Sequence, residues 1–204
     1  MLLSLDDIEP SGVYSLMTQT LIPRPIAWVL SENADGKFNL APFSYFNAVC
    51  SAPPLLMISV GKKPDGSFKD TRVNIEQRRD FVIHIPGRKQ LEAMNLSAET
   101  LPANVSEVDK LALATVDFPG SRLPRLADCA VAYACRCYDI HEIGAAAQSL
   151  ILGQITHVYL DDAVCQVRAD QRIYVDSVLL DPVCRLSAGE YAFLGERTLL
   201  QRPK

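Results

Sequence analysis

The stretch Leu21–Asn47, LIPRPIAWVLSENADGKFNLAPFSYFN, decides the fold because it predicts two strands joined by a tight turn. Leu21–Leu30 is the first β-prone run and contains the only tryptophan, Trp28. Asn33–Gly36 supplies the turn, since its Asp-Gly pair accepts the positive φ values that short hairpins need. Phe38–Cys50 then returns as a second run, rich in Phe and Tyr.

Pro42 lies inside the second run and has no N–H group to donate to a strand ladder. We therefore expect this strand to be an edge strand, to carry a bulge or to be interrupted there. Backbone groups left free beside aromatic, Asn and Ser side chains would face a cleft. Such a cleft favours a flat ligand with a polar edge.

The composition limits the classes of protein that this chain can represent. A length of 204 residues predicts one domain, 1–204, with a substantial core. The charge balance of 20 basic and 24 acidic residues gives 20 − 24 = −4, so there is no general attraction to nucleic acid or to an anionic membrane. No run approaches the ~20 apolar residues of a membrane helix. The N-terminus lacks a basic segment and meets Asp6 and Asp7 early, which favours a cytoplasmic location.

The six cysteines do not form a metal-binding pattern. No Cys-x-x-Cys pair occurs, and the spacing matches no zinc module. We expect reduced, structural thiols and no metal site.

The rest of the chain predicts strands at both ends and helices between them. The expected strands are Val13–Ile22, Leu55–Val60, Phe81–Ile85, Ala130–Ile140, Leu150–Leu160, Ile173–Leu179 and Glu190–Leu194. The expected helices are Lys69–Arg79, with Asp70 or Thr71 as N-cap, Arg88–Glu99, and one starting at Ser106 with a capping-box pattern. This order indicates a mainly β (α+β) domain. Periodicity alone does not separate a barrel from a sandwich.

Several short motifs carry a resemblance to a known family. They are Arg24–Val29 (RPIAWV), Asn39–Asn47 (NLAPFSYFN), Pro53-Pro54, and Lys69-Asp70-Thr71 with Asn74. In this order and spacing they resemble the flavin reductase-like, FMN-binding split-barrel family. The resemblance implies a six-stranded Greek-key split β-barrel with peripheral helices. It also implies a homodimer with FMN at the interface and NADH or NADPH as co-substrate.

The start of the helix at Lys69 is the expected phosphate site. Free N–H groups at a helix N-terminus favour an anion, and Lys69 and Thr71 add an ammonium and a hydroxyl. The alternative is a routine N-cap beside a solvated lysine. The resemblance favours phosphate contacts here, with Ser59 near the ribityl-phosphate, while Asp70 should cap the helix. Removing the Thr71 hydroxyl is expected to weaken FMN binding by roughly 1–3 kcal/mol if it meets the phosphate.

The ring of the cofactor is expected along the second strand. Backbone groups of Phe43–Phe46 would bind its polar edge, assisted by polar side chains, and Trp28 would cover or border it. The alternative is that these aromatics belong to the core or to a dimer interface. Period-two spacing puts Phe43 and Tyr45 on one face and Ser44 and Phe46 on the other, so some must be structural. The full set of expected cofactor-binding residues is Arg24, Trp28, Asn39, Phe43, Ser44, Tyr45, Phe46, Asn47, Ser59, Lys69, Asp70, Thr71 and Asn74.

Arg24 lies between two prolines that restrict its direction. It is either a surface charge on a stiff connection or a cofactor contact.

The expected activity is that of an NAD(P)H-dependent flavin reductase-type oxidoreductase, in which FMN carries the chemistry. No protein nucleophile or acid/base residue is expected, so the catalytic residues stay unassigned. Relatives often carry Gly-Asp-His where this chain has Ala146-Ala147-Gln148, and the histidines His84, His141 and His157 are expected to be structural or exposed. A flavin-accepting monooxygenase is the expected partner. The alternatives are a flavin-dependent oxygenase of the same fold, or a non-catalytic FMN-binding or structural dimer.

Overall fold

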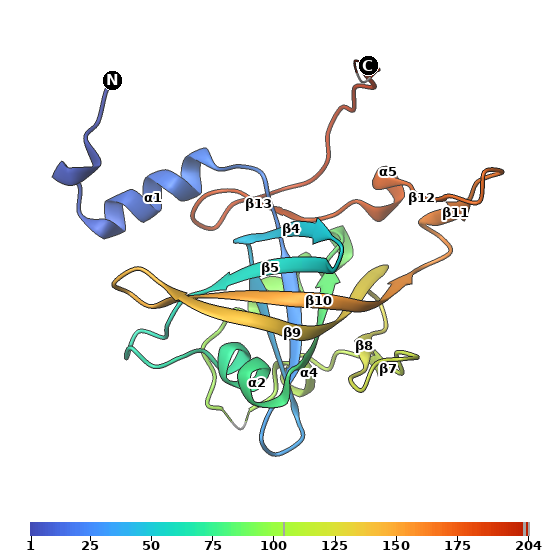
Figure 1. Cartoon of the computed structure of the whole chain (residues 1–204), viewed down its shortest axis with the longest axis horizontal. Coiled ribbons are helices and arrows are strands. Elements are labelled where there is room, and N and C mark those ends of the chain that lie inside the picture. The colour runs from blue at the N-terminus through green and yellow to red at the C-terminus, as the bar shows by residue number, and fades with distance from the viewer. Residues whose placement is uncertain (104, 202, 204) are drawn as a thin grey trace.

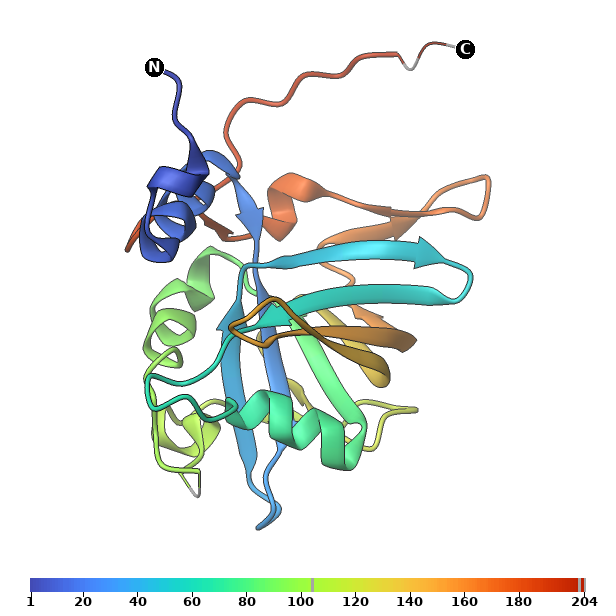
Figure 2. The same cartoon turned by 60° about the vertical axis from the view of Figure 1, so that its left-hand side comes forward.

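The computed structural model describes residues 1–103, 105–201 and 203, and its centre is a seven-stranded antiparallel sheet that curls into a barrel (Figures 1 and 2). The strand order is β3-β2-β6-β9-β10-β5-β4. The strands are β2 (Ala27–Glu32), β3 (Phe38–Phe43), β4 (Phe46–Ser51), β5 (Pro54–Val60), β6 (Asp80–Ile85), β9 (Val131–Ile143) and β10 (Gln148–Leu160).

The predicted strand Phe38–Cys50 is interrupted after Phe43, and Pro42 lies in an edge strand, which is one of the three alternatives expected for it. It forms β3 at one edge of the sheet and β4 at the other, with Ser44 and Tyr45 between them. Pro42 lies in the edge strand β3 opposite Trp28, and the Ser59 N–H donates to the Tyr45 carbonyl at 2.8 Å. This interruption explains why the sheet has seven strands and not the six expected for the split barrel.

Shorter elements surround the barrel. They are η1 (Leu5–Asp7), α1 (Pro10–Thr20), β1 (Arg24–Pro25), α2 (Asp70–Arg78), η2 (Arg88–Gln90), α3 (Leu91–Leu96), α4 (Glu107–Lys110), β7 (Thr115–Val116), β8 (Arg125–Leu126), β11 (Cys165–Val167), β12 (Ile173–Val175), α5 (Ser177–Leu180), β13 (Cys184–Arg185) and β14 (Tyr191–Ala192). A small sheet β1-β13-β14 joins the two ends of the chain beside α1.

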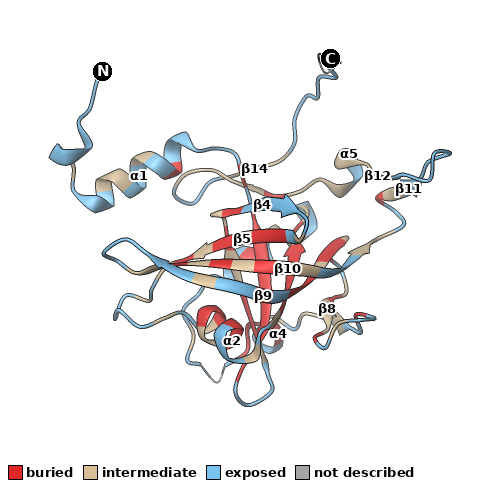
Figure 3. Ribbon diagram, viewed as in Figure 1, coloured by how far each residue is buried: buried red, intermediate tan, exposed pale blue. Residues whose placement is uncertain are grey.

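The core consists of two clusters on the two faces of the sheet. Trp28, Leu30 and Val82 pack against α3, α4 and the segment that follows them. Val29, Phe81 and Ile83 face the opposite way with Ile75 of α2. Because neighbouring strand residues point to opposite faces, β2 and β6 are buried on both sides (Figure 3).

Two element predictions were wrong. Val13–Ile22 is not a strand, because α1 covers Pro10–Thr20 with Pro10 at its first turn. Ile173–Leu179 splits into β12 and α5, since the Asp176 carboxylate accepts the N–H groups of Val178 and Leu179 and starts a helix.

The helix predictions at Lys69 and Ser106 were correct. α2 begins at Asp70, so Lys69 and not Asp70 or Thr71 is the N-cap residue. The Ser106 hydroxyl accepts the Asp109 N–H at 3.2 Å and caps α4. The six cysteines are free thiols, and burial raises the pKa of Cys129 to about 12. Among the described residues no His, Cys, Asp or Glu cluster suits a metal ion, and no helix has the length and apolar character needed to cross a membrane.

Candidate functional site

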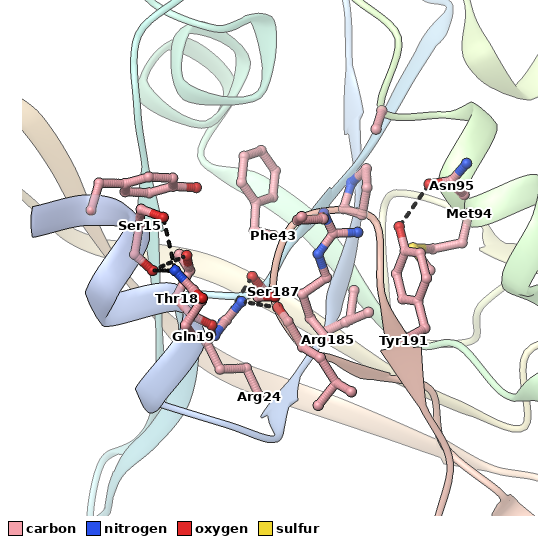
Figure 4. Close-up of a pocket in the computed structure, with 17 residues that line it drawn as sticks. Ser15, Thr18, Gln19, Arg24, Phe43, Met94, Asn95, Arg185, Ser187 and Tyr191 are labelled. Carbon is pink, nitrogen blue, oxygen red and sulfur yellow. Dashed lines mark hydrogen bonds between the residues drawn. The ribbon is translucent and has the colours of Figure 1, made fainter. Parts of the chain in front are cut away.

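A cleft of about 600 Å³ opens where β3 ends (Figure 4). Its walls come from α1, β1, the end of β3, α3, and the β13–β14 hairpin, so both ends of the chain contribute. The lining residues are Tyr14, Ser15, Thr18, Gln19, Arg24, Ile26, Pro42, Phe43, Ser44, Met94, Asn95, Ala98, Arg185, Leu186, Ser187, Ala188 and Tyr191. Of the expected site residues, Arg24, Phe43 and Ser44 lie here.

Arg24 is held by the protein itself. Its guanidinium donates to the carbonyls of Thr18 and Leu21 at 2.7 Å and of Leu186 at 2.6 Å, and its Nε lies 3.4 Å from the Ser44 hydroxyl. The residue is 8% exposed. The surface-charge interpretation was therefore wrong: Arg24 ties α1 and the C-terminal hairpin to the barrel.

Arg185 lies directly opposite Arg24 in the β1–β13 pair, and no sequence pattern pointed to it. Its guanidinium carbon is 4.6 Å from the centroid of the Tyr191 ring, and one N–H donates to the Ala188 carbonyl. Tyr191 in turn donates its hydroxyl to the Asn95 side chain at 2.7 Å, which joins the hairpin to α3 (Figure 4). Only the folded chain brings these three residues to one wall.

A second, smaller cavity of about 50 Å³ lies at the start of α2. The expected residues Asn39, Lys69, Asp70 and Thr71 all line it. Ala98 lines both this cavity and the cleft, and the Lys69 Nζ lies 5.6 Å from the centroid of the Phe43 ring, which lines the cleft.

Lys69 and its neighbour differ in their ion pairing. Partial burial lowers the pKa of Lys69, and among the described residues no carboxylate pairs with it. The Asp70 carboxylate is instead held by Lys63 at 2.8 Å. The start of α2 therefore presents helix N-terminal amides and an ammonium without an ion-pair partner among the described residues, which favours an anionic group. Glu99 and Glu107 line the same cavity, where Glu99 pairs with Lys110 at 2.6 Å and Glu107 accepts the Leu40 N–H.

Buried amide side chains connect α2 to the β2–β3 hairpin. Asn39 donates to the Thr71 hydroxyl at 2.9 Å, and Asn74 donates to Asn33 at 2.8 Å and to the Ser31 hydroxyl at 3.2 Å. All five residues are at most 5% exposed. The prediction of a cofactor contact for Asn74 is corrected, because its side-chain amide is committed to holding the helix in place.

The exposed edge of β3 is covered by the start of α4. The Glu107 carboxylate accepts the Leu40 N–H at 2.9 Å, and the Ser106 hydroxyl donates to the Phe38 carbonyl at 2.6 Å. Burial raises the pKa of Glu107. These two side chains satisfy the edge groups that a further strand would otherwise bind.

Two predicted aromatic contacts are also corrected. Trp28 is 1% exposed in the core, and its indole N–H donates to the Ser97 hydroxyl at 2.8 Å. Phe46 is 8% exposed in the other core cluster. The core alternative was therefore right for both rings. Phe43 is also largely buried but forms part of the cleft wall.

The other expected residues line neither cavity in the described part of the chain. The Tyr45 ring lies near Tyr14, and its buried hydroxyl has no partner among the described residues. Asn47 is exposed on β4. Ser59 accepts a hydrogen bond of 3.0 Å from Gln148, the residue that stands where relatives often have histidine.

The histidines have no place in the cleft. His84 is fully buried between the Trp28 carbonyl and the Leu126 N–H, and burial lowers its pKa to about 4. His141 is exposed beside Asp139 at 3.1 Å, and His157 is exposed on β10.

Comparison with known proteins gives a consistent family. The sequence model of the flavin reductase like domain matches residues 17–172. A protein of unassigned function from Halalkalibacterium halodurans, BH2278, is 34% identical over all of this chain and 97% of its own.

Two solved structures are similar over nearly their whole length. Nitrilotriacetate monooxygenase component B from Bacillus cereus is 29% identical with a TM-score of 0.89, and the match covers 98% of each chain. The 2-nitrobenzoate 2-nitroreductase NbaA from Pseudomonas fluorescens is 28% identical with a TM-score of 0.87, covering 100% of this chain and 96% of the other.

Proposed function

The chain belongs to the flavin reductase-like family, and on that premise we propose that it binds FMN along β3 and passes electrons from a reduced nicotinamide to an acceptor. The phosphate would lie at the start of α2, and the ring system would extend past Phe43 into the cleft. The observation that carries this proposal is Lys69. It is a partly buried ammonium at a helix N-terminus, without an ion-pair partner in the part of the chain that the structure describes, and 5.6 Å from the ring centroid of the cleft residue Phe43.

The phosphate end fits the residues present. A lysine without a carboxylate partner among the described residues gains from an anion, and α2, nine residues long, contributes its N-terminal dipole. Thr71 lies in the first turn of the same helix. Asp70 is neutralised by Lys63, so its charge is offset before a phosphate arrives.

The ring end also fits. A volume of about 600 Å³ lies within the range of cofactor sites, and the cleft combines apolar walls with a few polar groups. Phe43 and Ile26 provide apolar surface, while Ser44 provides a hydroxyl beside the interruption between β3 and β4.

When bound, the flavin supplies the two-electron chemistry, and the protein supplies binding and orientation. Lys69 would hold the phosphate, and β3 would orient the ring against Phe43. The α1 wall and the C-terminal hairpin would limit access of water. None of these roles requires a protein nucleophile.

We propose a homodimer, because α1 has few contacts within its own chain. It is eleven residues long with only Thr18 buried, and it stands away from the barrel (Figure 1). An isolated helix of this length is marginal in water. Tyr14, Met17, Leu21 and Ile22 are exposed on or just after it, and a second copy would cover them. FMN bound beside α1 would then lie near the subunit interface.

The similarity to a monooxygenase component B supports a role in supplying reduced flavin to a partner oxygenase. A cytoplasmic location is part of the proposal. The similarity to NbaA supports a second candidate, direct reduction of a small nitroaromatic acceptor. The two functions differ in whether the acceptor enters the cleft or the reduced flavin leaves it.

The test is a spectrum of the purified protein, followed by titration with FMN and anaerobic addition of NADH and then NADPH. We expect a 1:1 FMN complex whose absorbance near 450 nm, the usual oxidised-flavin band, bleaches with one of the two donors. A nitroaromatic acceptor added afterwards separates the two candidates, since only direct reduction consumes it without added free flavin.

Three results would contradict parts of the proposal. A bound flavin that resists both donors would move the function to an oxygenase or a carrier of the same fold. A protein that stays colourless after addition of FMN would remove the cofactor itself. Light scattering that gives 22.5 kDa in place of twice that mass would remove the dimer.

A further inference from the structure

We propose that the outer part of the cleft binds a planar carboxylate, of the aromatic carboxylate class, and that Arg185 is the residue that recognises it. This inference rests on the proposed function, because the ligand would be the second substrate beside the bound flavin. It adds the chemical class of that ligand and a specificity-determining residue.

The first observation is the charge of the cleft wall. The chain as a whole carries −4, yet none of the 17 described residues that line the cleft is Asp or Glu. Two of them, Arg24 and Arg185, are arginines that face each other as Cα partners across β1 and β13. Like charges directly opposite in a strand pair repel, so an anion between them is favoured.

The second observation is the difference between these two arginines. Arg24 uses its guanidinium for three backbone carbonyls and for Ser44, and it is buried. Arg185 makes one hydrogen bond, to the Ala188 carbonyl, and no ion pair among the described residues. An arginine carries five N–H donors, so most of those on Arg185 are available to a ligand.

The third observation is the planar shape of the Arg185 guanidinium and the residues that surround it. The Arg185 guanidinium carbon lies 4.6 Å from the centroid of the Tyr191 ring, and the Tyr191 hydroxyl is held by the Asn95 side chain at 2.7 Å (Figure 4). A planar guanidinium matches a carboxylate through two parallel hydrogen bonds. Met94, Ala98 and Leu186, which also line the cleft, provide apolar wall for the ring that carries the carboxylate, apart from the Ile26 and Phe43 surface assigned to the flavin.

Two other anions share this chemistry, namely the FMN phosphate and the pyrophosphate of a nicotinamide dinucleotide. Lys69 and the N-terminus of α2 already provide a separate site for the first. The Arg185 guanidinium alone suits one carboxylate better than a pyrophosphate. A pyrophosphate would need a second cation, and the donors of Arg24 are already occupied. The experiment therefore includes an arm for each of these ligands.

The test measures, by titration calorimetry on the FMN-loaded protein, the binding of benzoate and of its neutral isostere benzamide. We expect benzoate to bind at least tenfold more tightly than benzamide. R185A should weaken benzoate binding at least tenfold and leave benzamide within twofold. R185K should give an intermediate loss, since an ammonium keeps the charge without the planar guanidinium.

The matched control is R136A, which removes the same charge from an exposed position on β9 outside the cleft and should change neither affinity. Thermal melting of each variant checks folding. If R185A does not fold, R185K carries the test, with a loss of at least threefold in benzoate affinity expected.

Equal binding of benzoate and benzamide, or benzoate binding that does not respond to Arg185, would overturn the inference. So would a tenfold loss of FMN affinity in R185A, or a tenfold rise in KM for the nicotinamide donor with benzoate affinity unchanged. Failure of the proposed function is distinguishable, because it appears as a protein that binds no FMN. The benzoate and benzamide comparison can still be read on that protein.

Discussion

The two ends of β3 lie beside two different kinds of polar site. At the Asn39 end, side-chain amides and hydroxyls are buried and bonded to one another, as in Asn39–Thr71 and Asn74–Asn33. At the Ser44 end, the cleft contains Arg185 with most of its donors free. Lys69 lies between the two, partly buried and unpaired among the described residues.

The difference separates polar residues that hold the fold from polar residues that can bind a ligand. A buried polar group costs free energy unless its hydrogen bonds are made, so a saturated network stabilises the protein and offers nothing to a ligand. A cationic group with free donors at an open cleft adds little to stability but can bind an anionic ligand. The predictions below test this assignment, from the largest expected effect to the smallest.

The largest effect is expected from His84, a buried polar residue whose two ring nitrogens are both hydrogen-bonded within the protein. Its Nε2 accepts the Leu126 N–H, so this nitrogen must be unprotonated in the folded state. The folded pKa of about 4 lies below the ordinary value of 6.5, so the unfolded chain binds the proton first. Stability is therefore complete above pH 6.5 and falls as the pH drops toward 4. The total loss is about 3 kcal/mol, at about 1.4 kcal/mol per pH unit.

Urea unfolding of wild type and H84Q between pH 7.5 and 5 measures the part of this loss that falls above pH 5, about 2 kcal/mol for 1.5 pH units. Restricting the range to pH 5 keeps most carboxylates ionised, and the difference between the two proteins isolates the histidine. Parallel pH profiles for the two would show that His84 does not control acid stability.

The second effect is expected from Asn74. N74A removes two hydrogen bonds and leaves the Asn33 side-chain oxygen buried without its donor, while the Ser31 hydroxyl keeps the Asn39 amide at 3.3 Å. We expect the free energy of unfolding to fall by about 2 kcal/mol, while the FMN dissociation constant of the folded protein stays within twofold. A tenfold loss of FMN affinity with little change in stability would put Asn74 on the ligand-binding side of the comparison.

The split barrel was implied by the family resemblance, because periodicity alone did not separate a barrel from a sandwich. Local signals located some of its elements: Pro42 lies in an edge strand, one of the alternatives that it indicated, and Lys69–Thr71 correctly predicted a helix start. The error over Val13–Ile22 arose because β-branched residues outweighed a helical spacing that was present. Val13, Leu16 and Met17 stand at i, i+3 and i+4 after a proline.

The cleft was beyond local reasoning for a physical reason. Arg185 and Tyr191 meet Arg24 and Asn95 only because the C-terminal hairpin pairs with β1, and no short-range pattern encodes that pairing. Sequence also did not separate Trp28, a core residue, from Phe43, a cleft residue. Both are aromatic residues on β-prone runs, and only the packing of α3 and its Ser97 cap against Trp28 distinguishes them.

The third effect is expected from Lys69, which should act on binding and not on stability. K69A removes the cation from the proposed phosphate site, and we expect the FMN dissociation constant to rise about tenfold, or about 1.4 kcal/mol. The free energy of unfolding should change little, because no ion pair is lost among the described residues. Flavin fluorescence titration measures the affinity. K89A, which removes the same charge from an exposed position on η2, is the control. Equal affinities for K69A and K89A would remove Lys69 from the site.

The smallest effect is expected from Thr71, which lies on the boundary between the two sites. Its hydroxyl accepts the Asn39 amide at 2.9 Å, yet the residue lines the cavity at the start of α2. At 1% exposure, its hydroxyl is more fully committed to the closed network than to a ligand. T71A should therefore lower the free energy of unfolding by about 1 kcal/mol and change FMN affinity less than twofold. T71S should restore stability, because it keeps the hydroxyl. If T71A instead weakens FMN binding tenfold and T71S restores the affinity, the Thr71 hydroxyl contacts the phosphate. Thr71 would then belong with Lys69 among the ligand-binding residues and not among those that hold the fold.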